Sequence, residues 1–452
     1  MWELSKTRST HFVGIGGIGM SGIAEVLLDM GYPVSGSDLT TGPIVDNLRA
    51  KGAQINLGHA AAQVDAAGLV VCSTAINAAN PEVERARELG LPVWRRADML
   101  AALMRLKRGI AVAGSHGKTT TTSMLATIFH EAALDPTHII GGVVANLGGN
   151  ARYGNGPALI AEADESDGSF LLLDPMVAIV TNIDNDHLDH HGTEENIRRA
   201  FAAFVARVPA TGTVVVNGQD EGCRLAFADV RRPLLRFGIG DKSLDYNAED
   251  IEYGSEATSF VLWRRGERIG SLTMRLSGSH NVMNALAALA VADAEGVPFG
   301  ASQAGLARFA GVGRRLERLW RSGEFEVVDD YGHHPTEIRA TLATLRRHWG
   351  KPVCVVFDPP RYTRTQQLWQ DFATSFGDAD EVFIGPIYAA SETPLEGVTG
   401  EALAQAVPGA KYLSRLQDME ALVRERRDRP MVFLTLGAGA VSRIAREMVA
   451  YL

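Results

Sequence analysis

Residues 110–122 bring together the groups that bind a triphosphate. They read IAVAGSHGKTTTT, an apolar run that ends in glycines before a Lys-Thr pair opens a predicted helix. Backbone N–H groups, the helix N-terminus and the Lys118 ammonium would converge on one phosphate. In a phosphate loop these residue types place Lys118 at the β- and γ-phosphates and the Thr119 hydroxyl at Mg²⁺. The usual first glycine falls at Val112, so an ordinary glycine-rich turn is the alternative.

A second glycine-rich loop lies near the N-terminus. Residues 10–28 read THFVGIGGIGMSGIAEVLL, which predicts a strand, a G-x-G-x-x-G turn and an amphipathic helix, a Rossmann-like opening. Gly14, Gly16 and Gly19 would let the backbone approach a pyrophosphate, and Asp38 ends the next predicted strand where a ribose hydroxyl could lie. The pattern alone leaves the ligand open, a nicotinamide dinucleotide included, and a turn that serves only helix packing is the alternative.

Short apolar strands alternate with Ala-rich helices over residues 42–96, which predicts a doubly wound parallel sheet. In such sheets ligands collect at the carboxyl ends of the strands. His59, Ser73 and Thr74 follow predicted strands and could therefore contact the ligand of the first loop. An ordinary surface histidine is an equal alternative for His59.

Two predicted strands after the phosphate loop end in acids and histidines. Residues 158–167 read ALIAEADESD, and residues 177–192 read VAIVTNIDNDHLDHHG. Because parallel strands end at the same edge of a sheet, both clusters should open beside the phosphate loop. Glu162 and His187 thus become candidate metal ligands next to Thr119. Mg²⁺ prefers oxygen ligands, so a solvated polar cluster is the alternative for His187.

Two later motifs carry polar groups at predicted helix starts. Residues 277–288 read SGSHNVMNALAA, where the Asn281 amide could cap the helix or meet an adenine edge. Arg361 and Arg364 follow another predicted strand and, three residues apart, could both face a carboxylate. Ordinary surface ion pairing is the alternative for these arginines.

Composition narrows the class of protein. The chain has 452 residues and a formal net charge of −9, and no basic stripe stands out, which argues against nucleic acid as a partner. Cys72, Cys223 and Cys354 form no C-x-x-C motif, which argues against a disulfide framework or zinc module. We find neither a signal-peptide pattern nor an apolar run long enough for a bilayer, so we expect a cytoplasmic protein with no membrane partner.

The order of predicted elements indicates an α/β fold of three domains. We expect a Rossmann-like domain over residues 1–106, a central P-loop ATPase-like domain with a mostly parallel sheet over 107–312, and a second Rossmann-like domain over 313–452. Within the central domain, the short strands predicted over residues 211–278 look antiparallel.

Eight blocks together resemble the Mur ligases of peptidoglycan synthesis. They are HFVGIGGIGMSGIAEVL, AVAGSHGKTTTT, AEADESD, TNIDNDHLDHHG, SGSHNVMNALAA, GVGRRLE, DDYGHHPTEI and RYTRT, and they occur in the order of the family over nearly the whole chain. The last two blocks are most similar to the branch that attaches a single small amino acid. The neighbouring branch, which attaches a whole tripeptide, shares the N-terminal blocks.

The resemblance implies an ATP-dependent ligase that joins L-alanine to the lactoyl carboxylate of UDP-N-acetylmuramate through an acyl phosphate. It implies two Mg²⁺ ions, with Mn²⁺ able to substitute, and a monomer or homodimer. Thr119 and Glu162 would bind one ion, and His187 with Glu162 the second. Two departures from the family pattern lie at the expected amino-acid site: Asp358 and Pro360 stand in the block that is usually FQPH, and Ala440 ends a turn that usually ends in Asp.

The resemblance also implies four sets of site residues. The sugar nucleotide would contact Gly14, Gly16, Gly17, Ile18, Gly19, Asp38, His59, Ser73 and Thr74. ATP would contact Gly114, Ser115, His116, Gly117, Lys118, Thr119, Thr120, His280, Asn281 and Asp330. The amino acid would contact Tyr331, His333, Arg361 and Arg364. The residues expected to act in the reaction are Lys118, His187, Arg314 and His333, of which His333 would take the amine's proton.

Overall fold

The computed structural model describes residues 6–73, 75–390 and 392–452. Thr74, one of the predicted sugar-nucleotide residues, lies outside them. The chain divides into two compact units. The first contains residues 1–249, 261–272 and 283–309, and the second contains 250–260, 273–282 and 310–452. The domain boundaries after Leu106 and Val312 stay predictions.

The N-terminal part of the first unit is a five-stranded parallel sheet with the order β3-β2-β1-β4-β5. Its strands are β1 (Ser9–Val13), β2 (Val34–Asp38), β3 (Gln54–Leu57), β4 (Ala67–Cys72) and β5 (Val93–Arg95). Its helices are α1 (Ile18–Asp29), α2 (Pro43–Ala50), α3 (Pro81–Glu88) and α4 (Arg96–Met104). The strand order reverses at β1, so the glycine-rich loop after β1 opens where doubly wound sheets bind ligands. The Rossmann-like prediction is confirmed.

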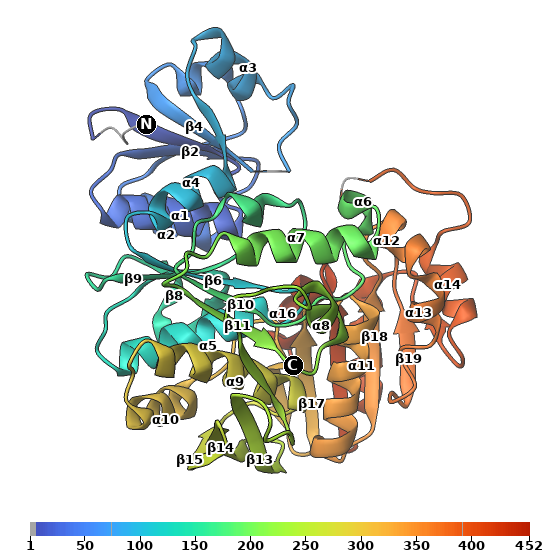
Figure 1. Ribbon diagram of the computed structural model, residues 1–452. Coiled ribbons are helices and arrows are strands. Elements are labelled where there is room, and N and C mark those ends of the chain that lie inside the picture. Colours follow the sequence, from blue (N-terminus) through green and yellow to red (C-terminus); the bar gives the residue numbers. More distant parts are fainter. Residues whose placement is uncertain (1–5, 74, 391) are drawn as a thin grey trace. The chain divides into compact units, whose positions relative to one another are not determined.

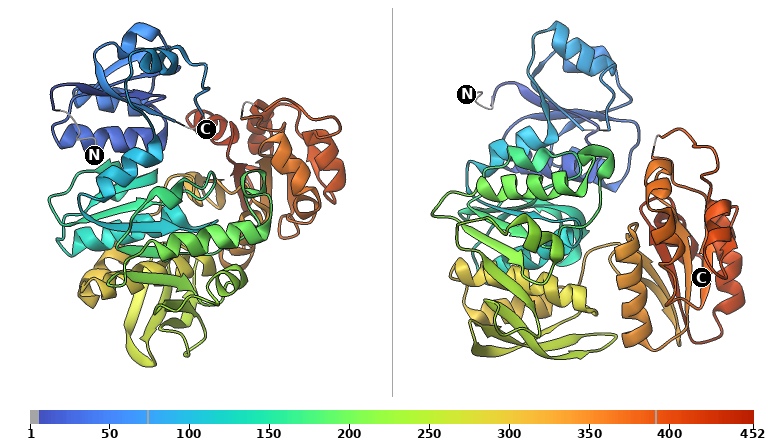
Figure 2. Two further views of the ribbon diagram at one scale, coloured as in Figure 1. Left: turned by 45° about the horizontal axis from the view of Figure 1, so that its top comes forward. Right: turned by 45° about the vertical axis from the view of Figure 1, so that its right-hand side comes forward.

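The central sheet has ten strands in the order β15-β14-β13-β12-β11-β10-β6-β9-β7-β8. They are β6 (Arg108–Ala113), β7 (Thr137–Val144), β8 (Gly149–Arg152), β9 (Ala158–Glu162), β10 (Val177–Val180), β11 (Thr213–Asn217), β12 (Leu235–Ile239), β13 (Tyr246–Tyr253), β14 (Thr258–Arg264) and β15 (Glu267–Met274). The helices are α5 (Lys118–Glu131), α6 (Leu188–His191), α7 (Glu194–Ala206), α8 (Glu221–Ala226), α9 (Ser279–Ala294) and α10 (Phe299–Arg308). In the views of Figures 1 and 2, α5 and α7 lie on opposite faces of this sheet.

The antiparallel prediction for residues 211–278 is wrong for its first part. Strand β11 pairs in parallel with β12, and β12 in parallel with β13. Helix α8 forms part of the connection between β11 and β12. This crossover returns the chain to the edge of the sheet where β11 begins, so β12 runs in the same direction as β11. The parallel part of the central sheet therefore includes more strands than the turn-rich sequence indicated.

The C-terminal sheet belongs to the second unit and has the order β16-β17-β21-β18-β19-β20. Its strands are β16 (Glu317–Ser322), β17 (Phe325–Asp330), β18 (Val353–Asp358), β19 (Glu381–Ile384), β20 (Lys411–Tyr412) and β21 (Met431–Gly437). Among the described strands of this sheet, only β16 pairs in an antiparallel way. The helices are α11 (Pro335–Thr344), α12 (Tyr362–Gln367), α13 (Trp369–Ala373), α14 (Gly400–Ala406), α15 (Met419–Arg426) and α16 (Val441–Val449).

Both faces of the C-terminal sheet are covered by apolar side chains. Along β18, Val355 and Phe357 pack into one hydrophobic cluster, while Cys354 and Val356 pack into another. This alternation is what a strand with period two requires when helices cover both faces. The nearly continuous apolar sequence of the strand has the same cause.

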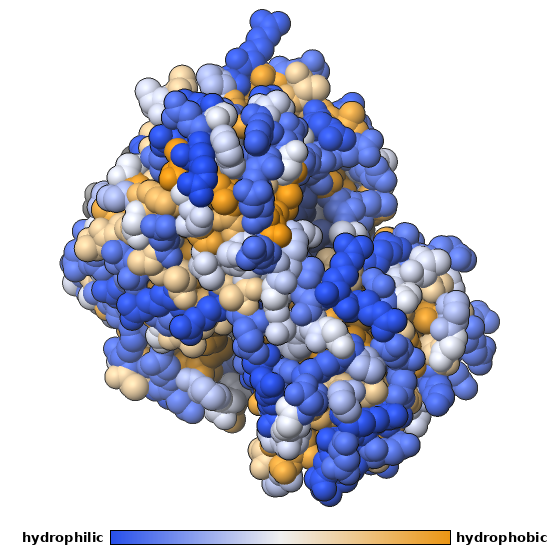
Figure 3. Space-filling model, turned by 90° about the horizontal axis from the view of Figure 1, so that it is seen from below, coloured by the Kyte–Doolittle hydropathy of each residue, from blue (hydrophilic) through white to orange (hydrophobic). Residues whose placement is uncertain are grey.

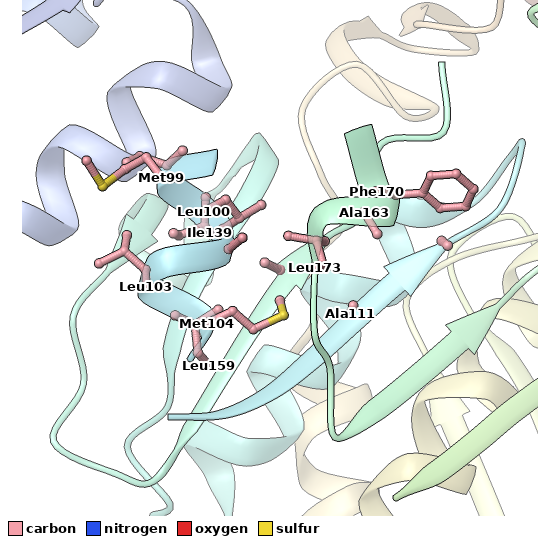
Figure 4. Close-up of a cluster of buried hydrophobic side chains, with 14 of the residues drawn as sticks. Met99, Leu100, Leu103, Met104, Ala111, Ile139, Leu159, Ala163, Phe170 and Leu173 are labelled. Carbon is pink, nitrogen blue, oxygen red and sulfur yellow. The ribbon is translucent and has the colours of Figure 1, made fainter. Parts of the chain in front are cut away.

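One hydrophobic core continues from the N-terminal sheet into the central sheet. Helix α4 contributes Met99, Leu100, Leu103 and Met104, which share a cluster with Leu159 of β9. Figure 4 shows these side chains of α4 beside the strands of the central sheet. This core excludes water from both parts at once, and the N-terminal sheet and most of the central sheet belong to the same compact unit.

None of the described helices is long and apolar enough to cross a membrane. On the face drawn in Figure 3, hydrophilic side chains predominate and hydrophobic side chains lie between them in smaller groups. The three cysteines are free thiols, of which Cys223 and Cys354 are buried. Most large apolar side chains are buried in the cores around the sheets.

Candidate active site

The phosphate-loop sequence forms the turn between β6, in the interior of the central sheet, and the N-terminus of α5. Gly114 and Gly117 have φ angles of 137° and 82°. A Cβ atom would lie 1.9 Å from Thr181 Oγ1 at Gly114 and 2.4 Å from Asn284 Oδ1 at Gly117. Both positions therefore require glycine. The loop's N–H groups and the start of α5 form the anion-binding geometry that the sequence predicted.

Lys118 folds back over this loop and lies next to an acidic strand end. Its Nζ donates hydrogen bonds to the carbonyls of Gly114 (2.6 Å) and Ser115 (3.2 Å), and to Glu165 Oε1 (2.7 Å). Burial lowers the pKa of Lys118, but the charges of Glu165, Asp164 and Glu162 outweigh burial and raise it overall. The ammonium that a phosphate needs is therefore kept charged by its surroundings.

Glu165 is the partner of Lys118 that the sequence analysis missed. Its side chain is buried, and burial raises its pKa to about 7, although Lys118 acts in the opposite direction. The block AEADESD contains four acids within six residues, so the signal was present. Only the path of the chain after β9 shows which carboxylate meets the lysine.

The structure brings Thr119 and Glu162 together, as predicted for a metal site. Thr119 Oγ1 donates to Glu162 Oε2 at 3.0 Å, and the Gly141 N–H donates to Glu162 Oε1 at 2.5 Å. Hydroxyl and carboxylate oxygens are ligands that Mg²⁺ prefers, so this pair fits the ion. His187 Nε2 lies 3.7 Å from Glu165 Oε1 and 3.4 Å from Asp186 Oδ2. The ligand role of His187 stays a prediction.

The segment after β10 holds the phosphate loop from the side. The Ser115 N–H donates to the carbonyl of Asn182 at 3.1 Å, and the His116 N–H donates to Asn182 Oδ1 at 2.8 Å. The Asp184 N–H donates to Ser115 Oγ at 2.9 Å, and the His116 ring contacts Asp184 at the same distance. Thr120 is buried in the first turn of α5. Asn182 and Asp184 were not predicted as site residues, although their block had been singled out for His187.

The N-terminal glycine loop is held by Asp38 at the end of β2. The Gly16 N–H donates to Asp38 Oδ2 at 2.8 Å, and the Gly17 N–H donates to the carbonyl of Gly14 at 3.3 Å. Helix α1 then begins at Ile18 and includes Gly19. The structure thus shows Asp38 stabilising the loop, while its predicted contact with a ribose stays a prediction.

His59 and Ser73 lie at the same edge of the N-terminal sheet. His59 Nδ1 is 2.9 Å from Ser37 Oγ of β2. The Ser73 N–H donates to the carbonyl of Val13, the last residue of β1, at 3.3 Å. Ser73 follows β4, which pairs with β1, whereas His59 follows β3, which lies beyond β2 in the same sheet. Both residues therefore lie after the carboxyl ends of parallel strands, as the doubly wound pattern predicted.

Two contacts join the glycine loop to the central sheet within the first unit. Arg96 of α4 pairs with Asp164 at 2.9 Å, and a Cβ atom at Gly19 would lie 3.1 Å from Arg96 Cδ. Asn150 of β8 donates from Nδ2 to the carbonyl of Ile18 at 2.9 Å. Arg96 therefore connects the start of α1 to Asp164. The residue that follows Asp164 in the chain, Glu165, contacts Lys118.

The first turn of α9 carries the predicted adenine residues. Asn281 is buried and donates from Nδ2 to the carbonyl of Ser277 at 2.8 Å. This hydrogen bond stabilises the start of α9. Burial and the charge of Arg315 lower the pKa of His280 to about 4. This ring is therefore neutral at pH 7. The adenine contacts of His280 and Asn281 stay predictions.

In the second unit, three predicted residues meet at the end of β17. The Arg314 guanidinium lies 4.5 Å from the centre of the Tyr331 ring and donates from Nη2 to the carbonyl of Gly437 at 2.7 Å. The Tyr331 and His333 rings contact each other edge to face at 5.1 Å. The structure thus groups Arg314, which the resemblance assigned to the reaction, with Tyr331 and His333, which it assigned to the amino-acid site.

Asp330 ends β17 beneath this group. It accepts hydrogen bonds from the N–H groups of Gly332 and Leu316, each at 2.8 Å, through its two oxygens. Burial raises its pKa to about 6. Asp330 therefore holds the local turns in place, and its predicted contact with the nucleotide ribose stays a prediction.

The two predicted arginines differ in exposure. The Arg361 side chain is 30% exposed and lies 3.7 Å from Glu392, whereas Arg364 in α12 is 6% exposed. Arg361 has a φ angle of 23°, and its N–H donates to the carbonyl of Tyr388 at 2.8 Å. Of the two guanidinium groups, that of Arg361 is therefore the more accessible to a small carboxylate.

The sequence departures at residues 358 and 440 lie side by side. Ala440 occupies the N-cap position of α16, where its side chain cannot accept a hydrogen bond. Asp358, at the end of β18, accepts one instead from the Val441 N–H at 3.2 Å. Burial raises the pKa of Asp358 to about 7. The carboxylate that caps this helix is thus supplied by a neighbouring strand.

Three family models match successive parts of the chain. They are described as Mur ligase family, catalytic domain (residues 9–108), Mur ligase middle domain (112–292) and Mur ligase, glutamate ligase domain (314–439). The chain belongs to the Mur ligase family. The predicted resemblance is confirmed, and the three matched ranges correspond in order to the three sheets.

Individual Mur ligases are similar over their full length. The chain is 46% identical over 452 residues to a UDP-N-acetylmuramate--L-alanine ligase of Syntrophotalea carbinolica, covering 99% of this chain and 98% of the relative. The structure of UDP-N-acetylmuramate-alanine ligase MurC from Thermotoga maritima has a TM-score of 0.84 at 30% identity, covering 98% of this chain and 99% of that one. A murein peptide ligase from Psychrobacter arcticus has a TM-score of 0.76 at 26% identity, covering 98% of both chains. The predicted three-domain α/β fold is confirmed.

Proposed function

We propose that this Mur ligase uses ATP to join L-alanine to the lactoyl carboxylate of UDP-N-acetylmuramate, with release of ADP and phosphate, in peptidoglycan precursor synthesis. The observation that carries the proposal is the full-length similarity to relatives named for this ligation. Lys118 at the phosphate loop and the adjacent Thr119–Glu162 pair support the use of ATP. The connection of the glycine loop to the central sheet through Arg96 supports delivery of the sugar nucleotide to that site.

The first step would activate the carboxylate, whose oxygen is otherwise a poor leaving group. A lactoyl oxygen attacks the γ-phosphorus, the new O–P bond forms, and the bond between the γ-phosphorus and the β,γ-bridging oxygen breaks to release ADP. Lys118 would stabilise the charge on the transferring group, since its own charge is maintained by Glu165, Asp164 and Glu162. Until the phosphate arrives, Glu165 holds this ammonium over the loop.

Thr119 and Glu162 would hold a Mg²⁺ ion through a hydroxyl and a carboxylate oxygen. When bound, the ion would offset negative charge on the phosphates. A second ion would bind near His187, and Mn²⁺ would be able to replace Mg²⁺. The buried Glu165 and Asp186, which lie beside His187, add carboxylate oxygens to that region.

The second step would form the amide. The amine of alanine attacks the acyl carbon, a C–N bond forms, and the C–O bond to phosphate breaks as the tetrahedral intermediate collapses. Arg361 and Arg364 would bind the alanine carboxylate, which aims the amine by restricting its orientation. His333 would accept the proton that the amine loses, and its ring is held by the contact with Tyr331.

The decisive experiment is a phosphate-release assay with ATP, Mg²⁺ and UDP-N-acetylmuramate, in which L-alanine is present, absent or replaced by a tripeptide. We expect phosphate release to require L-alanine, and mass spectrometry to show one alanine added to the sugar nucleotide. Release that requires the tripeptide would assign the chain to the other branch. ATP binding without turnover under all conditions would indicate a regulatory nucleotide-binding protein and contradict the proposal.

A further inference from the structure

A buried polar cluster lies beneath His59 in the N-terminal sheet, and the proposed reaction does not use it. Glu82 of α3 is fully buried, as is His11 of β1. Ser37 of β2 lies between Glu82 and His59 and is also fully buried. A carboxylate in such a place costs free energy unless hydrogen bonds compensate, so the role of Glu82 needs an explanation.

Glu82 is bound to the segment of His59 through Ser37 and Ala60, and its Oε2 also lies 3.4 Å from His59 Nδ1. Ser37 Oγ donates to Glu82 Oε2 at 2.6 Å, and the same Oγ is 2.9 Å from His59 Nδ1. The Ala60 N–H, one residue further on, points at Glu82 Oε1 at 3.4 Å. Burial raises the pKa of Glu82, but hydrogen bonds from His11, Ser37 and Ala60 and the charge of His11 lower it overall. Glu82 is therefore an ionised, acceptor-only group.

The positions of the protons follow from this chain of contacts. A serine hydroxyl has one proton, and the short bond to a carboxylate takes it. Ser37 Oγ can then only accept from His59, so His59 Nδ1 must carry a hydrogen. In the neutral imidazole the other nitrogen, Nε2, is left with a lone pair and is an acceptor.

His59 lies where such an acceptor can meet a ligand. Its side chain is 12% exposed. The preceding residue, Gly58, donates its N–H to the carbonyl of Asp38 at 2.7 Å, and Asp38 in turn binds the glycine loop at Gly16. Among the residues that the structure describes, none forms a hydrogen bond with His59 Nε2, while Nδ1 is engaged. Ser37 and Glu82 therefore orient the His59 ring through Nδ1, and Nε2 is its remaining acceptor.

We propose that Glu82 is a positioning residue for sugar-nucleotide binding: through Ser37 it fixes the tautomer of His59, so that Nε2 accepts a hydrogen bond from an N–H or O–H group of the nucleotide. The inference rests on the proposed function for the identity of the ligand. Its tautomer part is independent of that function, because it follows from the contacts of Glu82, Ser37 and His59 alone.

The tautomer is measured directly by nitrogen NMR of the full-length protein with labelled histidine. The chain has 12 histidines, so His59→Gln identifies the signal of His59 by its loss. We expect the wild-type ring at neutral pH to carry its hydrogen on Nδ1. In Glu82→Leu the Ser37 hydroxyl can turn toward Nδ1, so we expect the form with hydrogen on Nε2 to become populated.

Binding is then measured with UDP-N-acetylmuramate by calorimetry. We expect Glu82→Leu to weaken the affinity for UDP-N-acetylmuramate about tenfold, which is the effect of one hydrogen bond whose partner has the wrong tautomer. The KM values for ATP and L-alanine should change less than about twofold. Glu82→Gln, which keeps the volume and an acceptor oxygen, should rescue part of the affinity.

Ser35 offers a matched control on the same strand and face. Its Oγ lies 3.0 Å from Nδ1 of His11 and donates to Ser9 Oγ at 3.1 Å, and within the described part of the chain it forms no hydrogen bond with His59. Ser35→Ala should therefore leave both the His59 tautomer and the nucleotide affinity unchanged, although it also removes a buried hydroxyl of β2.

Two results would overturn the proposal. One is a wild-type His59 with its hydrogen on Nε2, a measurement that needs no variant to fold. The other is a folded Glu82→Leu protein with unchanged affinity for the sugar nucleotide. If ligation of L-alanine fails while the His59 tautomer is as expected, the proposed function is wrong and the proton arrangement stands.

Discussion

Lys118 Nζ and Glu165 Oε1 lie 2.7 Å apart, so the residue expected to bind phosphate is held by a buried carboxylate. We predict that Lys118→Ala lowers turnover by about 10²–10³, the scale for loss of one charge-stabilising group. The variant should also be less stable, because Glu165 loses its partner in a buried site. Breaking a buried ion pair costs about 3–5 kcal/mol.

A double variant separates these two effects. Lys118→Ala with Glu165→Gln removes the unpaired carboxylate, so thermal unfolding should return toward that of the wild type while turnover stays low. Phosphate release and the melting temperature of both variants check this. A double variant that regained activity would show that Lys118 acts on folding and not on the reaction.

Arg96 links the glycine loop to Asp164, and we predict that Arg96→Ala raises the KM for the sugar nucleotide about tenfold. The guanidinium packs against Gly19, close to where a diphosphate would bind. The pair is partly exposed, at 22% and 39%, so its loss should change the free energy of unfolding by less than about 1 kcal/mol. Asp164→Asn is the matched control for the ion pair itself. Steady-state kinetics with varied sugar nucleotide and varied ATP test the prediction, which an unchanged KM would contradict.

Asp358 should make the protein less stable as pH rises. Its pKa is about 7 in the folded state against 3.8 for an ordinary Asp, so between these pH values the folded state binds more protons than the unfolded state. The free energy of unfolding therefore falls from about pH 4 to pH 7 by an amount of up to about 4 kcal/mol. Asp358→Asn keeps an oxygen for the Val441 N–H and removes the titration.

The measurement is the melting temperature of wild type and Asp358→Asn across this range. We expect the difference between them to grow in favour of the variant up to about pH 7 and to stay constant above it. Asp371→Asn is the control, because the Asp371 side chain is 61% exposed. A difference that does not depend on pH would mean that Asp358 is ionised throughout the range.

The local motifs predicted the elements of the fold well because their signals are short-range. The glycine loops after β1 and β6 follow from residue types that tolerate positive φ and open a helix, as at Gly117. Strand β18 is the predicted strand that precedes Arg361, and its nearly continuous apolar sequence is explained by the apolar side chains that cover both faces of the sheet. The parallel pairing of β11 with β12 depends on a crossover through α8, and turn residues there carry no information about strand direction.

Side-chain partners were harder to predict because they depend on contacts between distant segments. The predicted pair Thr119–Glu162 is present, but Glu165 could not be singled out from the other acids of its block. The cap that Asp358 provides for α16 joins residues 83 positions apart. From the sequence, Asp358 and Ala440 were two departures at the expected amino-acid site. Only the pairing of β18 with β21 shows that the Asp358 carboxylate caps the helix that begins after Ala440.

Arg361 and Arg364 allow a direct test of the amino-acid site. We predict that Arg361→Ala raises the KM for L-alanine at least tenfold with little change in the KM for ATP, since a guanidinium bound to a carboxylate contributes mainly to binding. Its side chain is 30% exposed, so the melting temperature should change little. Arg364→Ala should also raise this KM but lower the melting temperature, because Arg364 is 6% exposed and its removal leaves a cavity. An alanine dependence that neither substitution changes would place the alanine carboxylate elsewhere, whatever happens to stability.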